Sequence, residues 1–167
     1  EPGNIIQKAL KIPIYRQNEG HNICDFDHKK VAIAINDQTR PLPHSILLLE
    51  LLRFLSENHV DRENITFYIS TGTHRRLTED EITTVLPGGL HEKYDWHCHN
   101  CDDEDNLAYL GETDAHTPVY VNRQFYQSDI KILVGNIEPH HFMGFSGGMK
   151  TASIGLTGRK TIEKNHS

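Results

Sequence analysis

Cysteine is scarce in this chain of 167 residues, and the three that occur, Cys24, Cys98 and Cys101, are an odd number. Such a set does not make the disulfide framework that stabilises small secreted proteins. The sequence therefore predicts a protein of a reducing compartment, the cytoplasm.

The chain also lacks a long apolar run, a cluster of basic residues and any internal repeat. No apolar segment approaches the ~20 residues that a membrane helix needs, and no basic-then-apolar signal pattern opens the sequence. The formal net charge is −6, from 17 Lys and Arg against 23 Asp and Glu, which disfavours non-specific nucleic-acid binding. These absences disfavour a membrane or a nucleic acid as the partner of this chain.

Several apolar, β-branched runs are present, and they predict strands. Residues 31–35, 65–69 and 130–134 are largely apolar, as buried strands are, and 31–35 is typical of a strand buried on both faces of a parallel sheet. A shorter run at 119–121 predicts a further strand. Between them, residues 45–58 have helical periodicity, so a helix is expected there.

The expected helices carry start signals of their own. Ser45 is a plausible N-cap for the helix over 45–58. Thr78 and Glu81 form a capping-box pattern at the start of a second helix over 78–86. Helices that alternate with strands predict an α/β fold, a mostly parallel, Rossmann-like sheet flanked by helices, and the length fits one domain over 1–167.

Two parts of the chain have little periodicity. Residues 1–28 are expected to form an N-terminal arm, in which 12–14 is an extended piece or an edge strand. Residues 91–118 are polar and are expected to be irregular, with a loop around 97–105.

Polar loops follow three of the expected strands, at 36–41, 70–75 and 135–150. In parallel sheets, ligands bind beyond the carboxyl ends of the strands. Arg40, in the first loop, can hold a carboxylate or phosphate with its guanidinium fork. The alternative for Arg40 is an ion pair with a nearby acid such as Asp37.

The second and third loops carry further candidates. His74 follows Thr71-Gly72-Thr73, whose hydroxyl and N–H groups can hold a phosphate, although a lone loop histidine is often merely solvated. The glycines of 144–148 let N–H groups converge on an anion, and Ser146 adds a hydroxyl donor. Lys150 adds a charge or a nucleophilic amine. The alternative is an ordinary glycine-rich turn.

A second kind of site is suggested by His97, Cys98, His99 and Cys101, because imidazoles and thiolates are zinc ligands. These ligands are bunched within five residues, and the acidic residues 102–105 that follow are typical of a solvated loop. These residues leave two classes of protein open. One is a zinc-dependent hydrolase, and the other is a non-catalytic nucleotide- or anion-binding module.

Four ordered motifs together resemble the lactate racemase family. They are Asp37-Gln38-Thr39-Arg40-Pro41, Ser70-Thr71-Gly72-Thr73-His74-Arg75, Pro139-His140 with Gly144-Phe145-Ser146-Gly147-Gly148-Met149-Lys150, and His166. The resemblance implies a nickel-pincer nucleotide cofactor, a pyridinium thioamide/thiocarboxylate mononucleotide that carries nickel. It also implies that this chain is the N-terminal domain of a two-domain enzyme, without the C-terminal domain and inactive alone.

The resemblance implies a role for each matching residue. Lys150 would hold the cofactor covalently, and His166 would ligate the nickel. His74 and His140 would be the general acid/base pair, and Arg40 would bind the substrate carboxylate. The implied cofactor-contacting residues are Asp37, Thr71, Gly72, Thr73, Ser146, Gly147 and Gly148.

The implied reaction is racemisation of a 2-hydroxy acid, lactate or a related acid, by hydride transfer to the cofactor. Plain proton abstraction from Cα is difficult because that C–H group is weakly acidic, and hydride transfer avoids it. Two histidines suit a symmetric reaction, since an ordinary pKa near 6.5 lets each accept or donate a proton.

Overall fold

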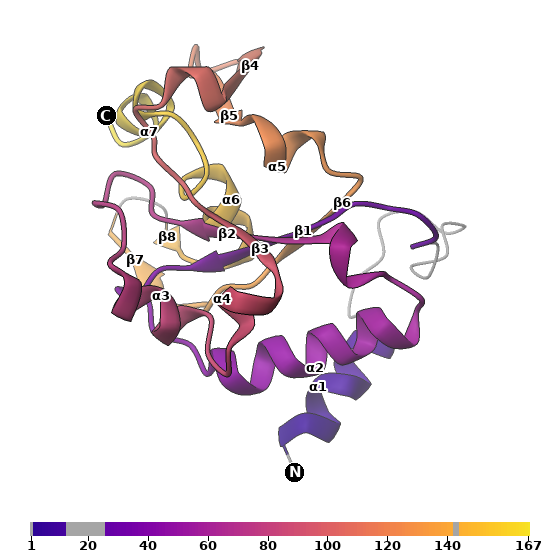
Figure 1. Ribbon diagram of the computed structural model, residues 1–167. Helices are drawn as coiled ribbons and strands as arrows, with labels where there is room; N and C mark the ends of the chain where they lie inside the picture. The colour runs from indigo at the N-terminus through magenta and orange to yellow at the C-terminus, as the bar shows by residue number, and fades with distance from the viewer. Residues whose placement is uncertain (1, 13–25, 142–143) are drawn as a thin grey trace.

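The computed structural model describes residues 2–12, 26–141 and 144–167. Its centre is a four-stranded sheet of β1 (Val31–Asn36), β2 (Ile65–Ser70), β3 (Asp95–Cys98) and β6 (Ile130–Leu133) (Figure 1). The strands lie in the order β3-β2-β1-β6, and every neighbouring pair is parallel. The predicted α/β class with a mostly parallel sheet is therefore confirmed.

The other elements surround this sheet. The α-helices are α1 (Pro2–Lys11), α2 (His44–Glu57), α3 (Glu79–Val85), α4 (Leu90–Lys93), α5 (Arg123–Gln127), α6 (Gly148–Ser153) and α7 (Arg159–Asn165). Short 3-10 turns span Arg62–Asn64 and Glu104–Asn106, and the remaining strands are β4 (Leu107–Glu112), β5 (Pro118–Asn122), β7 (Pro139–His140) and β8 (Gly144–Phe145).

Strand β1 is buried on both faces, as its composition predicted. Val31, Ile33 and Ile35 belong to the larger core, which the sheet shares with α2, α3 and α4. Ala32 and Ala34 face the other side, where they meet Phe125 of α5 and Leu156. Figure 1 shows α1 and α2 together below the sheet. Because other elements cover both faces of the sheet at β1, a ligand can approach the sheet at the ends of its strands.

The two expected helices are present, but only one has the expected cap. The capping box of α3 is confirmed, because the Thr78 hydroxyl accepts from the Glu81 amide and the Glu81 carboxylate accepts from the Thr78 amide. The prediction of Ser45 as a cap was wrong. Helix α2 begins at His44, and Pro43 stands at the N-cap without a side-chain hydrogen bond.

The expected N-terminal arm contains a helix, α1, that the sequence did not predict. Of the piece 12–14 expected to be extended or an edge strand, Ile12 is the one described residue. The Ile12 amide donates to the Lys8 carbonyl at 3.0 Å, which continues the helical pattern. Gln7 of α1 donates to the carbonyl and the carboxylate of Glu50 on α2, at 2.9 and 2.8 Å. The helix is thus stabilised by contact with α2. Residues 13–25, which include Pro13, Ile14 and Cys24, lie outside the described residues.

The segment 91–118 was predicted to be irregular with a loop around 97–105. A loop follows Cys98 as expected, but the prediction was wrong for the two strands in the segment. The segment contains β3, an edge strand that pairs with β2, and β4. In β3, Trp96 and Cys98 pack on the core, whereas Asp95 and His97 alternate with them and Asp95 is exposed. A strand with one apolar face has period-two polarity. This short alternation is the sequence signal that predicts β3.

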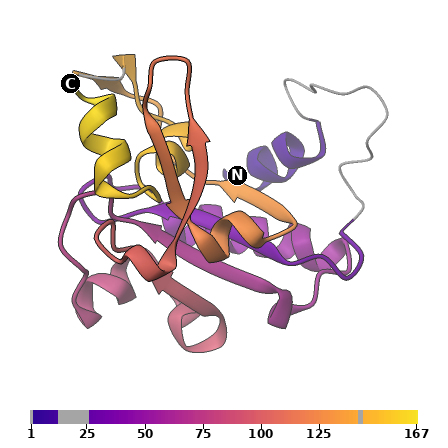
Figure 2. The same ribbon diagram turned by 90° about the horizontal axis from the view of Figure 1, so that it is seen from above.

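Strand β5 exists where the run at 119–121 predicted a strand, but it does not join the main sheet. It pairs antiparallel with β4 in a separate two-stranded ribbon, which Figure 2 shows as a projecting hairpin. Strand β6 was expected to be buried and is half-buried, because it is an edge strand with one neighbour, β1.

Among the described residues, no helix is long and apolar enough to cross a bilayer. The two cysteines within that part of the chain, Cys98 and Cys101, are free thiols.

Candidate functional site

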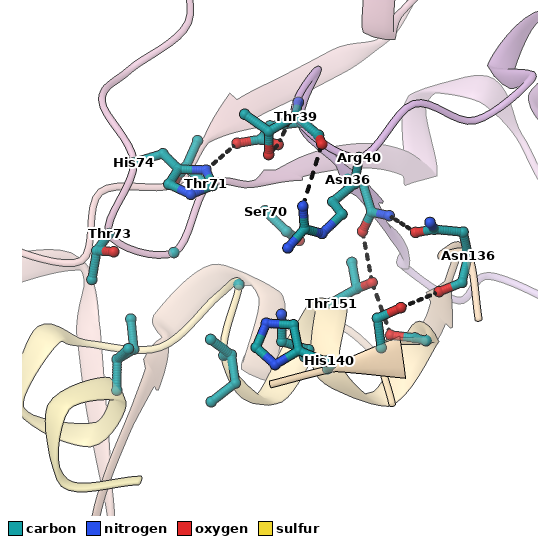
Figure 3. Close-up of a pocket in the computed structure, with 18 of the residues that line it drawn as sticks. Asn36, Thr39, Arg40, Ser70, Thr71, Thr73, His74, Asn136, His140 and Thr151 are labelled. Atoms are coloured by element: carbon teal, nitrogen blue, oxygen red, sulfur yellow. Dashed lines mark hydrogen bonds and ion pairs between the residues drawn. The ribbon is translucent and has the colours of Figure 1, made fainter. Parts of the chain in front are cut away.

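A cavity of about 240 Å³ lies at the carboxyl ends of β1 and β2, beside α6 and the end of α7. The three loops predicted to carry function all contribute to it. Its lining residues are Asn36, Asp37, Thr39, Arg40, Ser70, Thr71, Gly72, Thr73, His74, Asn136, His140, Ser146, Gly147, Lys150, Thr151, Ile154, Gly155, Ile162 and His166. Figure 3 shows His74, Arg40 and His140 around one common space. The cavity thus collects groups from distant segments of the chain.

Asp37 and His74 come from the first two loops and contact each other. The Nδ1 atom of His74 lies 2.7 Å from Oδ2 of Asp37. Asp37 is 3% exposed, whereas the His74 side chain is 53% exposed. The imidazole therefore stands at the surface of the cavity on a buried carboxylate.

Arg40 pairs with an acid, but not with Asp37. Its Nε lies 3.1 Å from Oε1 of Glu138, which comes from the loop after β6. Both side chains are 40% exposed, so water screens the pair and its net contribution to stability is small. The guanidinium still borders the cavity, with its charge available to an anion.

In the loop after β2, a hydroxyl and an amide group form hydrogen bonds with other parts of the protein. The Thr71 hydroxyl donates to the His99 carbonyl at 2.6 Å, and the Gly72 amide donates to the Gly155 carbonyl at 3.0 Å. Gly72 has φ +56°, a left-handed conformation that glycine adopts without strain. Thr73 is exposed at the edge of the cavity. These bonds hold the loop at one position on the cavity wall.

Ser146 lies in the loop after β8, and its hydroxyl is also engaged within the protein. It donates to the Asn136 carbonyl at 2.7 Å and accepts from the Glu138 amide at 3.0 Å. Gly147 lines the cavity with Ser146, but Gly148 is not among the lining residues. A Cβ at Gly148 would lie 3.0 Å from the Leu133 Cβ atom, so this glycine permits close packing of α6 on β6.

Three polar residues that the sequence reasoning missed connect the loops. Asn36 donates to the Asn136 side chain at 3.0 Å, and the Thr151 hydroxyl donates to the Asn36 side chain at 2.9 Å. Asn36 and Thr151 are buried, and all three line the cavity. A polar residue at the last position of an otherwise apolar strand is the signal that indicates Asn36.

The cationic groups of the site affect one another. Burial first, and the positive charge of Arg40 second, lower the pKa of Lys150, while the Glu138 carboxylate partly opposes them. Desolvation and then the charges of Lys150 and Arg40 lower the pKa of His140. Both effects increase the neutral fraction of the amine and the imidazole. Neutral nitrogen is the form that acts as a nucleophile, a base or a metal ligand.

His166 follows α7 and reaches the same cavity. Its ring lies nearly parallel to that of His140, with 6.5 Å between centroids and an interplanar angle of 22°. His141, the immediate neighbour of His140, is exposed and is not among the lining residues. His140, the residue that the family resemblance singled out, therefore lines the cavity, and His141 does not.

The side chains in segment 97–101, the candidate zinc ligands, contact different parts of the protein. The His97 ring packs against Tyr68 with 5.5 Å between centroids, and Cys98 packs on the main core. Nε2 of His99 lies 3.0 Å from the Thr157 carbonyl. Burial raises the pKa of both Cys98 and Cys101. Within the described parts of the chain, no three His, Cys, Asp or Glu side chains are grouped to hold a metal ion.

Comparison with proteins of known sequence gives one consistent family. The lactate racemase N-terminal domain matches over residues 1–167. The lactate racemase of Lactiplantibacillus plantarum is 31% identical over 162 residues, which are 97% of this chain and 38% of the relative. That of Thermoanaerobacterium thermosaccharolyticum is 29% identical over 165 residues, 98% of this chain and 38% of the relative.

Comparison with solved structures gives a matching fold. The lactate racemase apoprotein of T. thermosaccharolyticum superposes with a TM-score of 0.83 at 29% identity, over 96% of this chain and 38% of that one. A Thermotoga maritima protein shares the fold, with a TM-score of 0.76 at 23% identity, over 98% of this chain and 40% of that one. This chain spans well under half the length of these relatives. By sequence over its whole length and by fold, it belongs to the lactate racemase N-terminal domain family.

Proposed function

We propose that the full-length protein is a racemase of a 2-hydroxy acid, lactate or a related acid, and uses a nickel-pincer nucleotide bound at Lys150. The observation that carries this proposal is the single cavity lined by Arg40, His74, His140, Lys150 and His166. Those five residues come from four separate segments of the chain. When bound, the cofactor supplies an acceptor and donor of hydride for the substrate Cα.

The residues fit such a cofactor. Lys150 is a half-buried amine with a lowered pKa, which favours the neutral form that a covalent amide-type bond requires. His166 offers a single imidazole, and neutral imidazole is a good ligand for nickel. One protein ligand suffices for a metal whose other ligands belong to an organic group. Thr73 and Gly147 border the space in which the nucleotide would lie.

The chain's own groups would bind the substrate and move its hydroxyl proton. The Arg40 guanidinium would hold the substrate carboxylate by two parallel hydrogen bonds. His74 and His140 reach the cavity from different loops. One imidazole would take the hydroxyl proton, and the other would return a proton on the opposite face of the rotated intermediate.

The proposal is tested on the full-length protein, produced together with the enzymes that make the cofactor. Purified protein should interconvert the L and D forms of a 2-hydroxy acid and should contain nickel. Lactate is the first substrate to assay, followed by longer and polyhydroxylated 2-hydroxy acids. Protein that contains the cofactor but racemises none of these acids would contradict the proposal.

The C-terminal domain of the full-length protein is proposed as the intramolecular partner of this chain. The cytoplasmic location of the protein stays a prediction.

Arg40→Lys is expected to raise KM for the acid about 10- to 100-fold with a smaller change in kcat. Lysine keeps the charge but loses the planar fork that binds a carboxylate bidentately. Steady-state kinetics in both directions measure the effect. Arg53→Lys is the matched control, because Arg53 lies on α2 in an exposed ion pair with Glu57. An unchanged KM in Arg40→Lys would remove Arg40 from the substrate site.

The two alternatives from the sequence have less support. A zinc-dependent hydrolase would need a cluster of ligands, and the side chains of residues 97–99 diverge. A non-catalytic anion-binding module would not need two imidazoles and an amine of lowered pKa in one cavity.

A further inference from the structure

The contact between Asp37 and His74 has the geometry of a carboxylate that orients an imidazole. The 2.7 Å separation of Oδ2 and Nδ1 is short, as is typical of a charge-assisted hydrogen bond. The two residues belong to different loops, after β1 and after β2. Figure 3 shows the dashed contact that His74 makes.

The carboxylate is itself held in place. Its other oxygen, Oδ1, accepts from the Thr39 amide at 3.0 Å and from the Thr39 hydroxyl at 2.6 Å. The backbone also turns here, since the Arg40 amide donates to the Asp37 carbonyl at 3.2 Å. With Oδ1 fixed on Thr39, Oδ2 has one direction, which is toward His74. The buried carboxylate therefore cannot follow a rotation of the imidazole.

An ionised carboxylate only accepts hydrogen bonds, so the proton of this contact belongs to Nδ1 of His74. A neutral imidazole then has its lone pair on Nε2. We propose that Asp37 is a positioning residue that fixes His74 in the Nδ1–H tautomer, so that Nε2 is the nitrogen that exchanges a proton with the substrate hydroxyl. The catalytic part of this inference rests on the proposed function, whereas the tautomer does not.

This role differs from the cofactor contact that the family resemblance implies for Asp37. Both carboxylate oxygens already have partners within the protein, and the residue is 3% exposed. Asp37 borders the cavity, but the exposed side chain of this pair, and so the one more open to a ligand, is that of His74. The geometry therefore favours an action of Asp37 through His74.

The tautomer is measured by ¹⁵N NMR of histidine-labelled full-length protein without cofactor, at a pH of about 8.5, well above the ordinary histidine pKa. His74→Gln identifies the signals of residue 74. We expect the wild type to carry the proton on Nδ1. Asp37→Asn should no longer impose one tautomer, because an amide donates as well as accepts. A proton on Nε2 in the wild type, or the same tautomer in both proteins, would overturn the inference.

Kinetics of the cofactor-loaded protein test the consequence. Asp37→Asn is expected to lower kcat about 10- to 100-fold, as loss of a carboxylate that orients an imidazole does elsewhere. KM for the 2-hydroxy acid should stay within about twofold, and nickel content should not change. Loss of nickel with an unchanged tautomer would instead identify Asp37 as a cofactor contact and would overturn the positioning role.

A second pair of variants covers the case in which Asp37→Asn does not fold. Thr39→Val removes the hydroxyl that holds Oδ1 but keeps the shape of the side chain, and Thr39→Ser keeps the hydroxyl. We expect Thr39→Val to lower kcat about fivefold, the effect of one hydrogen bond, and Thr39→Ser to lose less. Equal kcat values in the two variants would contradict the inference. Absence of racemase activity in the wild type would contradict only the proposed function, since the NMR result stands by itself.

Discussion

Full-length protein with Lys150→Ala, co-produced with the cofactor-synthesis enzymes, is expected to carry no added mass and to lose its nickel and its racemase activity. Lys150 is the one lysine that lines the cavity in the described part of the chain. Burial and Arg40 lower its pKa, so its amine is more often neutral than an exposed lysine, as bond formation requires. Intact-mass measurement and nickel analysis read out the result.

Two further variants make this experiment specific. Lys150→Arg keeps the positive charge but cannot form the same covalent bond, so it should lose the added mass even if some cofactor binds non-covalently. Lys164→Ala, at an exposed position of α7, should keep both mass and nickel. If Lys150→Arg retained the full added mass, the attachment would be at another residue. If active wild type had neither added mass nor nickel, the proposed cofactor would be wrong.

Removal of the His74 or the His140 imidazole should abolish most turnover and leave the cofactor in place. We expect His74→Ala and His140→Gln each to lower kcat about 10²–10⁴-fold, the usual contribution of a general acid or base. The loss should be similar in both directions, because each racemisation needs one imidazole to accept a proton and the other to donate one. Chiral analysis of product from each enantiomer measures the two directions separately.

The matched control is His141→Gln. His141 is the exposed neighbour of His140 and does not line the cavity, so this variant should have wild-type kcat. Nickel content measured on all three variants separates loss of chemistry from loss of cofactor. If His74→Ala kept full activity with full nickel content, the acid/base assignment of His74 would be wrong.

Local sequence patterns were sufficient for the elements whose signals are short-range. The apolar runs of β1 and β2 indicate strands buried on two faces, and the capping box at Thr78 and Glu81 indicates the start of α3. These patterns work because side-chain burial and cap hydrogen bonds depend on a few neighbouring residues.

Elements that depend on distant partners were predicted less well. β3 has only half of its residues packed on the core, so its pattern is short and easily missed. β5 was predicted as a strand, but the sequence did not say which strand it would pair with, and its partner is β4. Helix α1 has no buried residue and is stabilised by its contact with α2. Pairing partners and docking surfaces are tertiary properties, and propensity alone does not encode them.

The sequence by itself determined the fold class, the family and the positions of the polar loops, because each is written in residue type and spacing. Only the tertiary structure decided what those loops do to one another. It joined Asp37 to His74 and Arg40 to Glu138, and it bonded the Ser146 hydroxyl to the Asn136 carbonyl. It also placed His140, but not His141, at the cavity. The reason is physical. Most of these contacts join residues of different loops, and the distances between the loops are set by the parallel pairing of the strands that precede them.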